Sequence, residues 1–364
     1  MIIDIRGTNT TNKGAQLMLE AICSRLGDTY EFSVSPTTTD AAVRRRLGLH
    51  LVLRYPLAPK LTATAGELVP ARVRARQRLV TDAEIGGVLD ASGFHYTDQL
   101  PTAFARSEAL AGRSWLRRGV PKVLLPQAFG PFEKSGTRRW SREALAQANL
   151  VFVRDRVSEK YVRALDVDTP IVRSPDFTIG MKPATVEPVC DQPFLALVPN
   201  KKLFTHGRLK REEYLQILSR FGEAAKANGL ASVVVEHEET DHPTARELAD
   251  RIGAPLFRDP DPLVLKGVLG QATAAVASRF HAVVGCVSQS VPTLALGWSH
   301  KYHELLDDFG VPERLVNPDT DPAAAITNLL ADEAGNARQK AQLPVLLEKV
   351  DAMWERTVDT LAGA

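Results

Sequence analysis

The chain of 364 residues is long for a single domain and suits two, each large enough to bury its own core. Hydrophobic residues make up 44% of the chain and charged residues 24%, a balance typical of ordinary globular proteins that excludes a disordered or membrane-embedded chain. The three cysteines lie far apart in sequence, so neither a disulfide framework nor a paired-cysteine metal site is indicated.

The charge is distributed unevenly between the two halves of the chain. Residues 1–181 carry 26 Lys and Arg against 18 Asp and Glu, a balance of +8, and the remainder carries 19 against 25, a balance of −6. The simplest interpretation is that the basic residues lie on solvated helix faces, and the alternative is attraction to an anionic membrane or a phosphate-bearing acceptor. Nucleic acid is not expected, because the basic segments lack interleaved aromatic residues.

Apolar segments alternate with helical patterns through the first half of the chain, as in a parallel sheet covered by helices. The sequence opens on a strand without the basic segment and long apolar stretch of a secretion signal, so we expect a cytoplasmic protein. Strands are expected at residues 1–5, 31–35, 83–89, 122–126 and 150–153, and helices at 15–26, 39–47, 102–118, 134–148 and 157–164. The proline-bearing stretch between about Leu49 and Leu79 is expected to be loop and helix rather than sheet.

Polar loops follow several of these strands, at the edge where open α/β sheets bind ligands. Asn12 and Gly14 follow the first strand and shape a turn that is neither a Walker loop nor a dinucleotide fingerprint. Ser92 and His95 follow the third strand, and Gln127 follows the fourth. We expect these five residues to line a ligand-binding crevice; a tight turn and an incidental surface histidine are the alternatives without function.

The prolines of residues 182–193 indicate a linker between a first domain, residues 1–181, and a second α/β domain, residues 194–336. Within the second domain, strands are expected at residues 194–198, 231–235, 274–277 and 291–296, and helices at 208–228, 245–252, 263–269, 282–287, 301–309 and 322–333. Residues 337–364 show a helical spacing of apolar side chains, which predicts a terminal helix with one apolar face.

The stretch of residues 272–301 organises the second domain, since it predicts a buried strand, a polar turn, an apolar helix and a second buried strand. Ser278 is expected to cap the helix, which places Arg279 and His281 in its first turn. Two cationic groups at a helix N-terminus repel its dipole unless an anion offsets them, so this turn, with Lys301 beyond the second strand, predicts an anion site. Taken singly, the histidine also fits a capping or core role and the arginine a surface ion pair.

The densest group of candidate metal ligands is residues 236–242, Glu-His-Glu-Glu-Thr-Asp-His. Its spacing does not match that of a metal site, so no metal is expected in this protein. We expect this segment to be a solvated loop.

Several short motifs occur in a fixed order along most of the chain: Asn12-Lys13-Gly14, Gly86-Gly87, Pro126 to Pro131, Val153 to Ser158, Ser174-Pro175-Asp176, Arg279-x-His281 and Val291-Pro292. With these motifs the chain resembles the polysaccharide pyruvyl transferase family. The resemblance implies an α/β fold of two Rossmann-like domains with a crevice between them, similar to GT-B glycosyltransferases. In such proteins a terminal helix, here residues 337–364, often packs back on the first domain. It also implies transfer of a pyruvyl group from phosphoenolpyruvate to sugar hydroxyls of a polysaccharide or glycolipid precursor, which forms a pyruvate ketal without a cofactor or a metal.

On this interpretation His281 and Arg279 are the catalytic candidates. Arg154 looks like this family's ligand for the anionic groups of the donor, and we expect Ser278 and Lys301 to bind the donor with it. The expected partners are phosphoenolpyruvate and a saccharide acceptor, either free or linked to a lipid at the inner face of the membrane.

Two other functions fit the same sequence. A GT-B-type nucleotide-sugar glycosyltransferase shares the two-domain form and the anion-binding turn, and a non-catalytic carbohydrate-binding relative keeps the site without turnover. Ala15 stands where the pyruvyl transferase family often carries an acidic residue, so any role of that acid has no counterpart in this chain.

Overall fold

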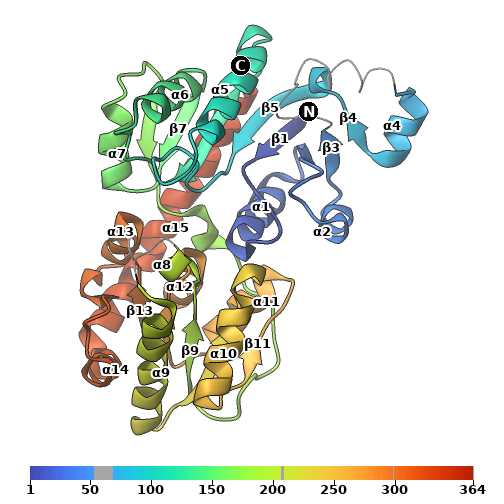
Figure 1. Cartoon of the computed structure of the whole chain (residues 1–364). Coiled ribbons are helices and arrows are strands. Elements are labelled where there is room, and N and C mark those ends of the chain that lie inside the picture. Colours follow the sequence, from blue (N-terminus) through green and yellow to red (C-terminus); the bar gives the residue numbers. More distant parts are fainter. Residues whose placement is uncertain (53–68, 206–208, 298, 364) are drawn as a thin grey trace. The chain divides into compact units, whose positions relative to one another are not determined.

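The computed structural model describes residues 1–52, 69–205, 209–297 and 299–363, and the chain divides into two compact units. Unit 1 comprises Met1–Thr10, Met18–Phe177 and Lys349–Ala364, and unit 2 comprises Thr11–Leu17 and Thr178–Glu348. Two helices, α1 (Lys13–Leu26) and α15 (Glu333–Ala362), therefore contribute residues to both units (Figure 1).

Unit 1 is built on a sheet of eight parallel strands in the order β4-β3-β2-β1-β5-β6-β7-β8. The strands are β1 (Ile2–Arg6), β2 (Glu31–Val34), β3 (His50–Val52), β4 (Leu79–Val80), β5 (Ile85–Asp90), β6 (Lys122–Gln127), β7 (Leu150–Val153) and β8 (Ile171–Arg173). The order reverses between β1 and β5, which makes the carboxyl ends of these two strands the topological switch point where such sheets bind ligands.

In the part of unit 1 that the structure describes, the helices are α1, α2 (Ala41–Arg46), α4 (Ala71–Gln77), α5 (Ala103–Arg117), α6 (Ser135–Ala146), α7 (Arg156–Arg163) and the end of α15. Every residue of β6 and β7 is buried, as expected for parallel strands covered on both faces. The end of α15 packs against this sheet, since a β-carbon on Gly87 would lie 3.1 Å from Leu361 Cδ2. The ring of Trp354 in the same helix meets Phe177 edge to face, with centroids 5.4 Å apart.

The prediction for the stretch between Leu49 and Leu79 is wrong in part. The structure has strands β3 and β4 there, joined to the edge of the sheet, and the helix α4; residues 53–68 lie outside the described residues. Strands of two or three residues at a sheet edge are too short to show a periodic pattern, which explains why the sequence did not indicate them.

Unit 2 has a sheet of six parallel strands in the order β11-β10-β9-β12-β13-β14, which is the strand order of Rossmann sheets. The strands are β9 (Phe194–Val198), β10 (Ala231–Val235), β11 (Leu256–Phe257), β12 (Ala274–Ala277), β13 (Thr293–Leu296) and β14 (Leu315–Val316). The helices are α8 (Lys202–Thr205), α9 (Arg211–Ala227), α10 (His242–Ile252), α11 (Pro262–Gly270), α12 (Phe280–Val287), α13 (His300–Asp308), α14 (Pro322–Ala331) and the beginning of α15. The switch point of this sheet lies between β9 and β12.

The fold class predicted from the sequence, α/β with two Rossmann-like units, is confirmed by these two parallel sheets. Each sheet is central and apolar, and each has its own switch point with polar loops at the carboxyl ends of its strands. In the described part of the chain, none of the helices combines the length and apolarity needed to cross a bilayer.

Candidate functional site

The switch point of unit 2 brings together the loops that follow β9 and β12. The Asn200 side chain donates from Nδ2 to the carbonyl oxygen of Ser278 at 2.8 Å, and the hydroxyl of Tyr302 donates to the same carbonyl at 2.8 Å. The Ser278 hydroxyl accepts a hydrogen bond of 2.9 Å from Tyr214. Ser278 is fully buried, so it fixes the loop at the sheet edge.

The predicted helix cap is wrong by one residue. Arg279 is the N-cap of α12 and makes no side-chain cap, while Ser278 is still part of the preceding loop. The Ser278 hydroxyl accepts a hydrogen bond from Tyr214 and does not cap the helix. This bond satisfies the hydroxyl in the interior of the protein. His281 is consequently the second residue of α12, close to the positive end of the helix dipole.

Arg279 is buried and held by two carboxylates from the loop after β10. Its Nε and Nη2 donate to Asp241 Oδ2 and Oδ1 at 2.6 and 2.7 Å, and Nη1 donates to Glu238. Burial opposes the charged guanidinium, but Asp241 and Glu238 outweigh it and raise the pKa of Arg279. These contacts join the loops after β10 and β12, and the role expected for Arg279 toward an anion stays a prediction.

The segment of residues 236–242 is not the solvated loop predicted from its composition. Glu236, His237 and Asp241 are 5%, 4% and 0% exposed, respectively. The charges are tolerated in the interior because each has a partner: Asp241 binds Arg279, and Glu236 Oε2 lies 2.6 Å from Nδ1 of His242. Among the described residues, no group of three or more His, Cys, Asp or Glu side chains is arranged to hold a metal ion.

The imidazole of His281 packs directly against the backbone at the start of α1. A β-carbon built on Gly14 would lie 2.1 Å from His281 Nδ1, so only glycine fits beside this ring. Asn12 holds the turn in place, because its Oδ1 accepts from the backbone N–H groups of Gly14 and Ala15 at 3.0 and 3.4 Å. The structure therefore joins Asn12 and Gly14 to His281 in one unit.

Other cationic groups gather around this turn. Lys301 Nζ lies 5.4 Å from the ring centroid of Phe280, and Lys13 Nζ lies 3.2 Å from Glu239 Oε1. Burial, with a further contribution from Arg279, lowers the pKa of Lys202. The helix N-terminus thus lies among several cationic side chains. Arg279 and Lys13 are paired with carboxylates, so Lys301 and Lys202 are the candidates to bind an anionic ligand here.

Two residues of this group, His237 and Lys202, were not candidates from the sequence. Burial, followed by the charges of His281 and Arg279, lowers the pKa of His237 to about 3, so this buried ring is neutral at physiological pH. Lys202 begins α8, a few residues beyond the end of β9. Because the strand at 194–198 was predicted, attention to the loop after each strand would have found Lys202.

The switch point of unit 1 holds the remaining candidates. A β-carbon on Gly7, whose φ is +78°, would lie 2.1 Å from Ser92 Oγ, so the loops after β1 and β5 touch at the glycine. The Asp90 carboxylate at the end of β5 is fully buried and accepts from Ser92 N at 3.0 Å and from the Tyr96 hydroxyl at 2.6 Å. Burial lowers the pKa of His95, the next polar residue of this loop.

Gln127 and Arg154 extend this group across β6 and β7. The Gln127 side chain is fully buried, and its Oε1 takes no hydrogen bond from the described residues. The carbonyl of Gln127 accepts from the backbone N–H of Arg154 at 3.0 Å. Arg154 Nη1 donates to Asp176 Oδ2 at 3.0 Å, with both side chains buried. The acceptor-side candidates Ser92, His95 and Gln127 therefore lie in unit 1, and Asn12 and Gly14 lie in unit 2.

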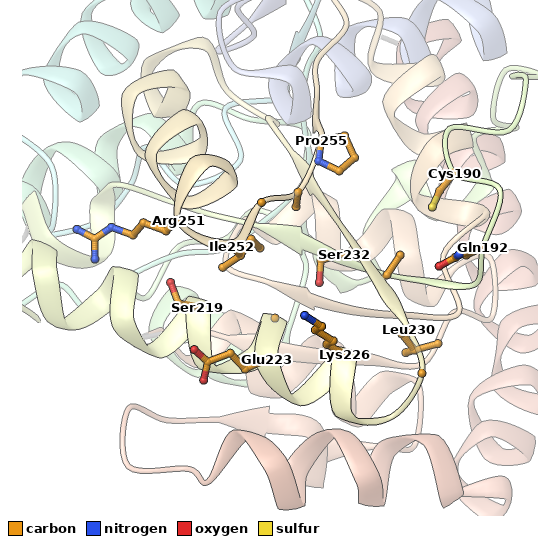
Figure 2. Close-up of a pocket in the computed structure, with 15 residues that line it drawn as sticks. Cys190, Gln192, Ser219, Glu223, Lys226, Leu230, Ser232, Arg251, Ile252 and Pro255 are labelled. Atoms are coloured by element: carbon orange, nitrogen blue, oxygen red, sulfur yellow. The ribbon is translucent and has the colours of Figure 1, made fainter.

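A hollow of about 640 Å³ lies in unit 2 (Figure 2). Ser219, Glu223 and Lys226 line it from α9, and Arg251 lines it from the end of α10. It opens at the amino end of β10, where Ser232 lies, whereas ligands of open α/β sheets bind at the carboxyl ends of the strands. None of the predicted site residues lines this hollow, so we do not assign it to the site.

Fold and site together define an α/β protein with two Rossmann-like sheets and a cationic helix N-terminus at the second switch point. The chain belongs to the polysaccharide pyruvyl transferase family, whose model matches residues 12–300. No curated protein sequence matches it significantly.

Solved structures share the fold at low sequence identity. The UDP-GlcNAc 2-epimerase from Neisseria meningitidis bound to UDP-GlcNAc has a TM-score of 0.62 and 11% identity over 100% of both chains. The S. aureus MnaA–UDP structure has a TM-score of 0.61 and 14% identity over 93% of this chain and 90% of that one. A glycosyltransferase from Rickettsia africae has a TM-score of 0.58 and 10% identity over 99% and 97%. These similarities support the GT-B-like fold predicted from the sequence.

Proposed function

We propose that this enzyme transfers a pyruvyl group from phosphoenolpyruvate to two hydroxyls of a sugar, which forms a pyruvate ketal and releases inorganic phosphate. Membership in the family supports the reaction class. The observation that carries the proposal is the position of His281 at the N-terminus of α12, against Gly14, with Lys301 beside the ring of the preceding residue, Phe280. This turn offers a proton donor and positive charge to a donor that bears a phosphate and a carboxylate.

The reaction needs one proton transfer before any bond to the sugar forms. An acid protonates the terminal carbon of the enol, and the cationic carbon that results accepts the first sugar hydroxyl, which gives up its proton. The carbon–oxygen bond to phosphate then breaks, and the second hydroxyl attacks the same carbon and closes the ketal. One of the two hydroxyl protons restores the proton of the acid, and the other protonates the leaving phosphate. In the overall reaction, phosphoenolpyruvate and a diol give the ketal and inorganic phosphate.

We assign the acid to His281. The helix N-terminus disfavours a protonated imidazole, and the phosphate of a bound donor favours it, so the donor brings the histidine to its acidic form. Lys301 and Lys202 supply movable point charges for phosphate and carboxylate, and Arg154 and Ser278 remain donor-side candidates. Arg279 acts in this scheme by holding the turn rather than by touching the donor, since Asp241 and Glu238 occupy its guanidinium.

The acceptor sugar is assigned to the switch point of unit 1. The buried Oε1 of Gln127 is an acceptor that a sugar hydroxyl can satisfy, and Ser92 and His95 of the loop after β5 are the further candidates for hydrogen bonds to the sugar. The acceptor is a saccharide of a polysaccharide or of a lipid-linked precursor, and the enzyme acts in the cytoplasm.

The test is phosphate release from phosphoenolpyruvate over a panel of glycosides with vicinal and 4,6-diols. We expect release only with particular diols, together with a product that carries one ketal-bound carboxylate by mass spectrometry. Phosphate release in the absence of any glycoside, or no release with any, would contradict the proposal.

A second candidate is transfer of a sugar from a nucleotide sugar. It is favoured by the fold, because the similar N. meningitidis epimerase structure holds UDP-GlcNAc. Turnover of a UDP-sugar, but not of phosphoenolpyruvate, would select this function. Binding of glycosides with turnover of neither donor would instead indicate a non-catalytic carbohydrate-binding protein.

A further inference from the structure

One face of unit 1 concentrates arginines around a single indole. Helices α5 and α6 pack against each other (Figure 1), and Trp140 of α6 is only partly buried. The guanidinium carbons of Arg106, Arg113 and Arg139 lie 5.6, 5.9 and 5.0 Å from the centroid of its ring. Three like charges around one ring repel each other, and an anion laid over them relieves that repulsion.

Carboxylates within the chain do not neutralise this face. Residues 101–149 contain nine Lys and Arg against three Asp and Glu. Glu108 is buried against Arg6, and Glu143 pairs with Arg113 at 2.6 Å. Among the described residues, no carboxylate forms an ion pair with Arg106, Arg117 or Arg139, which leaves three positive charges exposed on one surface.

Two leucines of α5 are exposed, one on the face of these arginines and one beside that face. Leu110 and Leu116 of α5 are 37% and 59% exposed. Arg106, Leu110 and Arg117 recur at helical spacing, so they share one face of α5. The 15 residues of this helix extend over about 22 Å, which is far wider than one phosphate group.

We propose that this arginine-rich face, made of Arg106, Leu110, Leu116, Arg117, Arg139 and Trp140, binds the surface of an anionic lipid bilayer. A broad exposed face with guanidiniums for phosphates, an indole at the level of the head groups and leucines that enter the acyl boundary matches a membrane surface better than a single small anion. None of these residues belongs to the candidate site, so the proposal does not depend on the transferase chemistry.

The test is sedimentation of the full-length protein with vesicles of phosphatidylcholine, alone or mixed with phosphatidylglycerol. We expect binding to the anionic vesicles only, falling as salt rises, because the attraction is screened. The Arg106→Gln/Arg117→Gln/Arg139→Gln variant should partition about a hundredfold more weakly, since each cationic residue near an anionic surface contributes about fivefold.

The matched control removes three exposed arginines of α2 and α4 in the same unit, Arg45→Gln/Arg72→Gln/Arg76→Gln. It should bind the vesicles almost as well as the unchanged protein. An equal loss of binding in the control would overturn the proposal, because binding would then depend only on the overall charge of the protein. Equal binding of the unchanged protein to neutral and anionic vesicles would also overturn it.

A second variant, Leu110→Ser/Leu116→Ser, keeps every charge. It should bind several-fold more weakly at each salt concentration with an unchanged dependence on salt, and unaltered binding would contradict a bilayer as the partner. The proposal would also be overturned if the protein bound a short RNA or DNA duplex more tightly than it binds anionic vesicles. Turnover of a soluble glycoside is expected to stay at the unchanged level in all these variants, which separates this test from that of the proposed function.

Discussion

The α-carbon of Gly14 lies against the imidazole of His281, and a β-carbon at this position would approach Nδ1 to 2.1 Å. The absence of a side chain at Gly14 therefore allows the imidazole of His281 to occupy its position, although the two residues are far apart in sequence. Since Asn12 caps the turn that carries Gly14, the start of α1 forms one wall of the site.

The first prediction concerns this contact. Gly14→Ala should displace the His281 ring and lower turnover with phosphoenolpyruvate at least tenfold, while the helix itself is slightly favoured by alanine. Gly285→Ala in α12 is the matched control, because its β-carbon would meet Leu269 at an ordinary 3.4 Å. Steady-state kinetics of both variants test this prediction. Equal turnover in the two variants would show that catalysis does not depend on the position of the His281 ring.

The second prediction is that His281→Gln folds and binds the donor but loses turnover by about 10²- to 10⁴-fold, the contribution of a general acid. In the unchanged protein, donor binding should take up protons near neutral pH, because the phosphate favours the imidazolium. Calorimetry in buffers of different ionisation enthalpy measures this uptake. Near-normal turnover in the variant would exclude His281 as the general acid and leave it with a structural role only.

The third prediction separates Arg279 from the donor ligands. Arg279→Ala leaves Asp241 and Glu238 buried without their cation, so the free energy of unfolding should fall by about 3–5 kcal/mol. Urea denaturation measures this change. A variant of unchanged stability that binds phosphoenolpyruvate weakly would instead support the direct role in donor binding that the sequence suggested.

The fourth prediction concerns the dependence of stability on pH. His237 has a pKa of about 3 in the folded protein and about 6.5 when unfolded, so the unfolded chain binds more protons between these values. Its contribution to stability is present above pH 6.5 and is lost as pH falls toward 3, amounting to about 2 kcal/mol by pH 5. Denaturation at pH 7 and pH 5 should show this loss in the unchanged protein and less of it in His237→Asn. Parallel losses in both would exclude His237 as the cause.

The fifth prediction tests the acceptor side. Gln127→Met removes the buried Oε1 without opening a cavity, and KM for the glycoside should rise about tenfold, as expected for one lost hydrogen bond, while KM for phosphoenolpyruvate stays constant. Gln147→Met is the control, because the Oε1 of Gln147 is likewise buried without a hydrogen bond but lies outside the site. A rise in KM for phosphoenolpyruvate, with KM for the glycoside unchanged, would contradict the assignment of Gln127 to the acceptor site.

The central strands could be predicted because parallel strands are apolar along their whole length, and β7, β9, β10 and β12 have the predicted bounds. The segment after β12 also gave the position of His281, and the end of β6 gave that of Gln127. The sequence could not show that Arg279 is engaged, because its partner Asp241 is 38 positions away and only the fold brings them together. For the same reason residues 236–242 looked like a solvated loop, since a dense run of charges is buried only when distant partners reach it.

The return of α15 to unit 1 has a consequence for synthesis of the protein on the ribosome. Gly87 and the ring of Phe177 pack against Leu361 and Trp354, which are translated long after the strands of unit 1. Unit 1 therefore cannot be completed until unit 2 and α15 have been synthesised, and this side of its apolar sheet stays uncovered until then. We expect a stop codon shortly after residue 348 to expose the core of unit 1, whose strands lie in the first half of the chain, and to commit the product to aggregation or proteolysis.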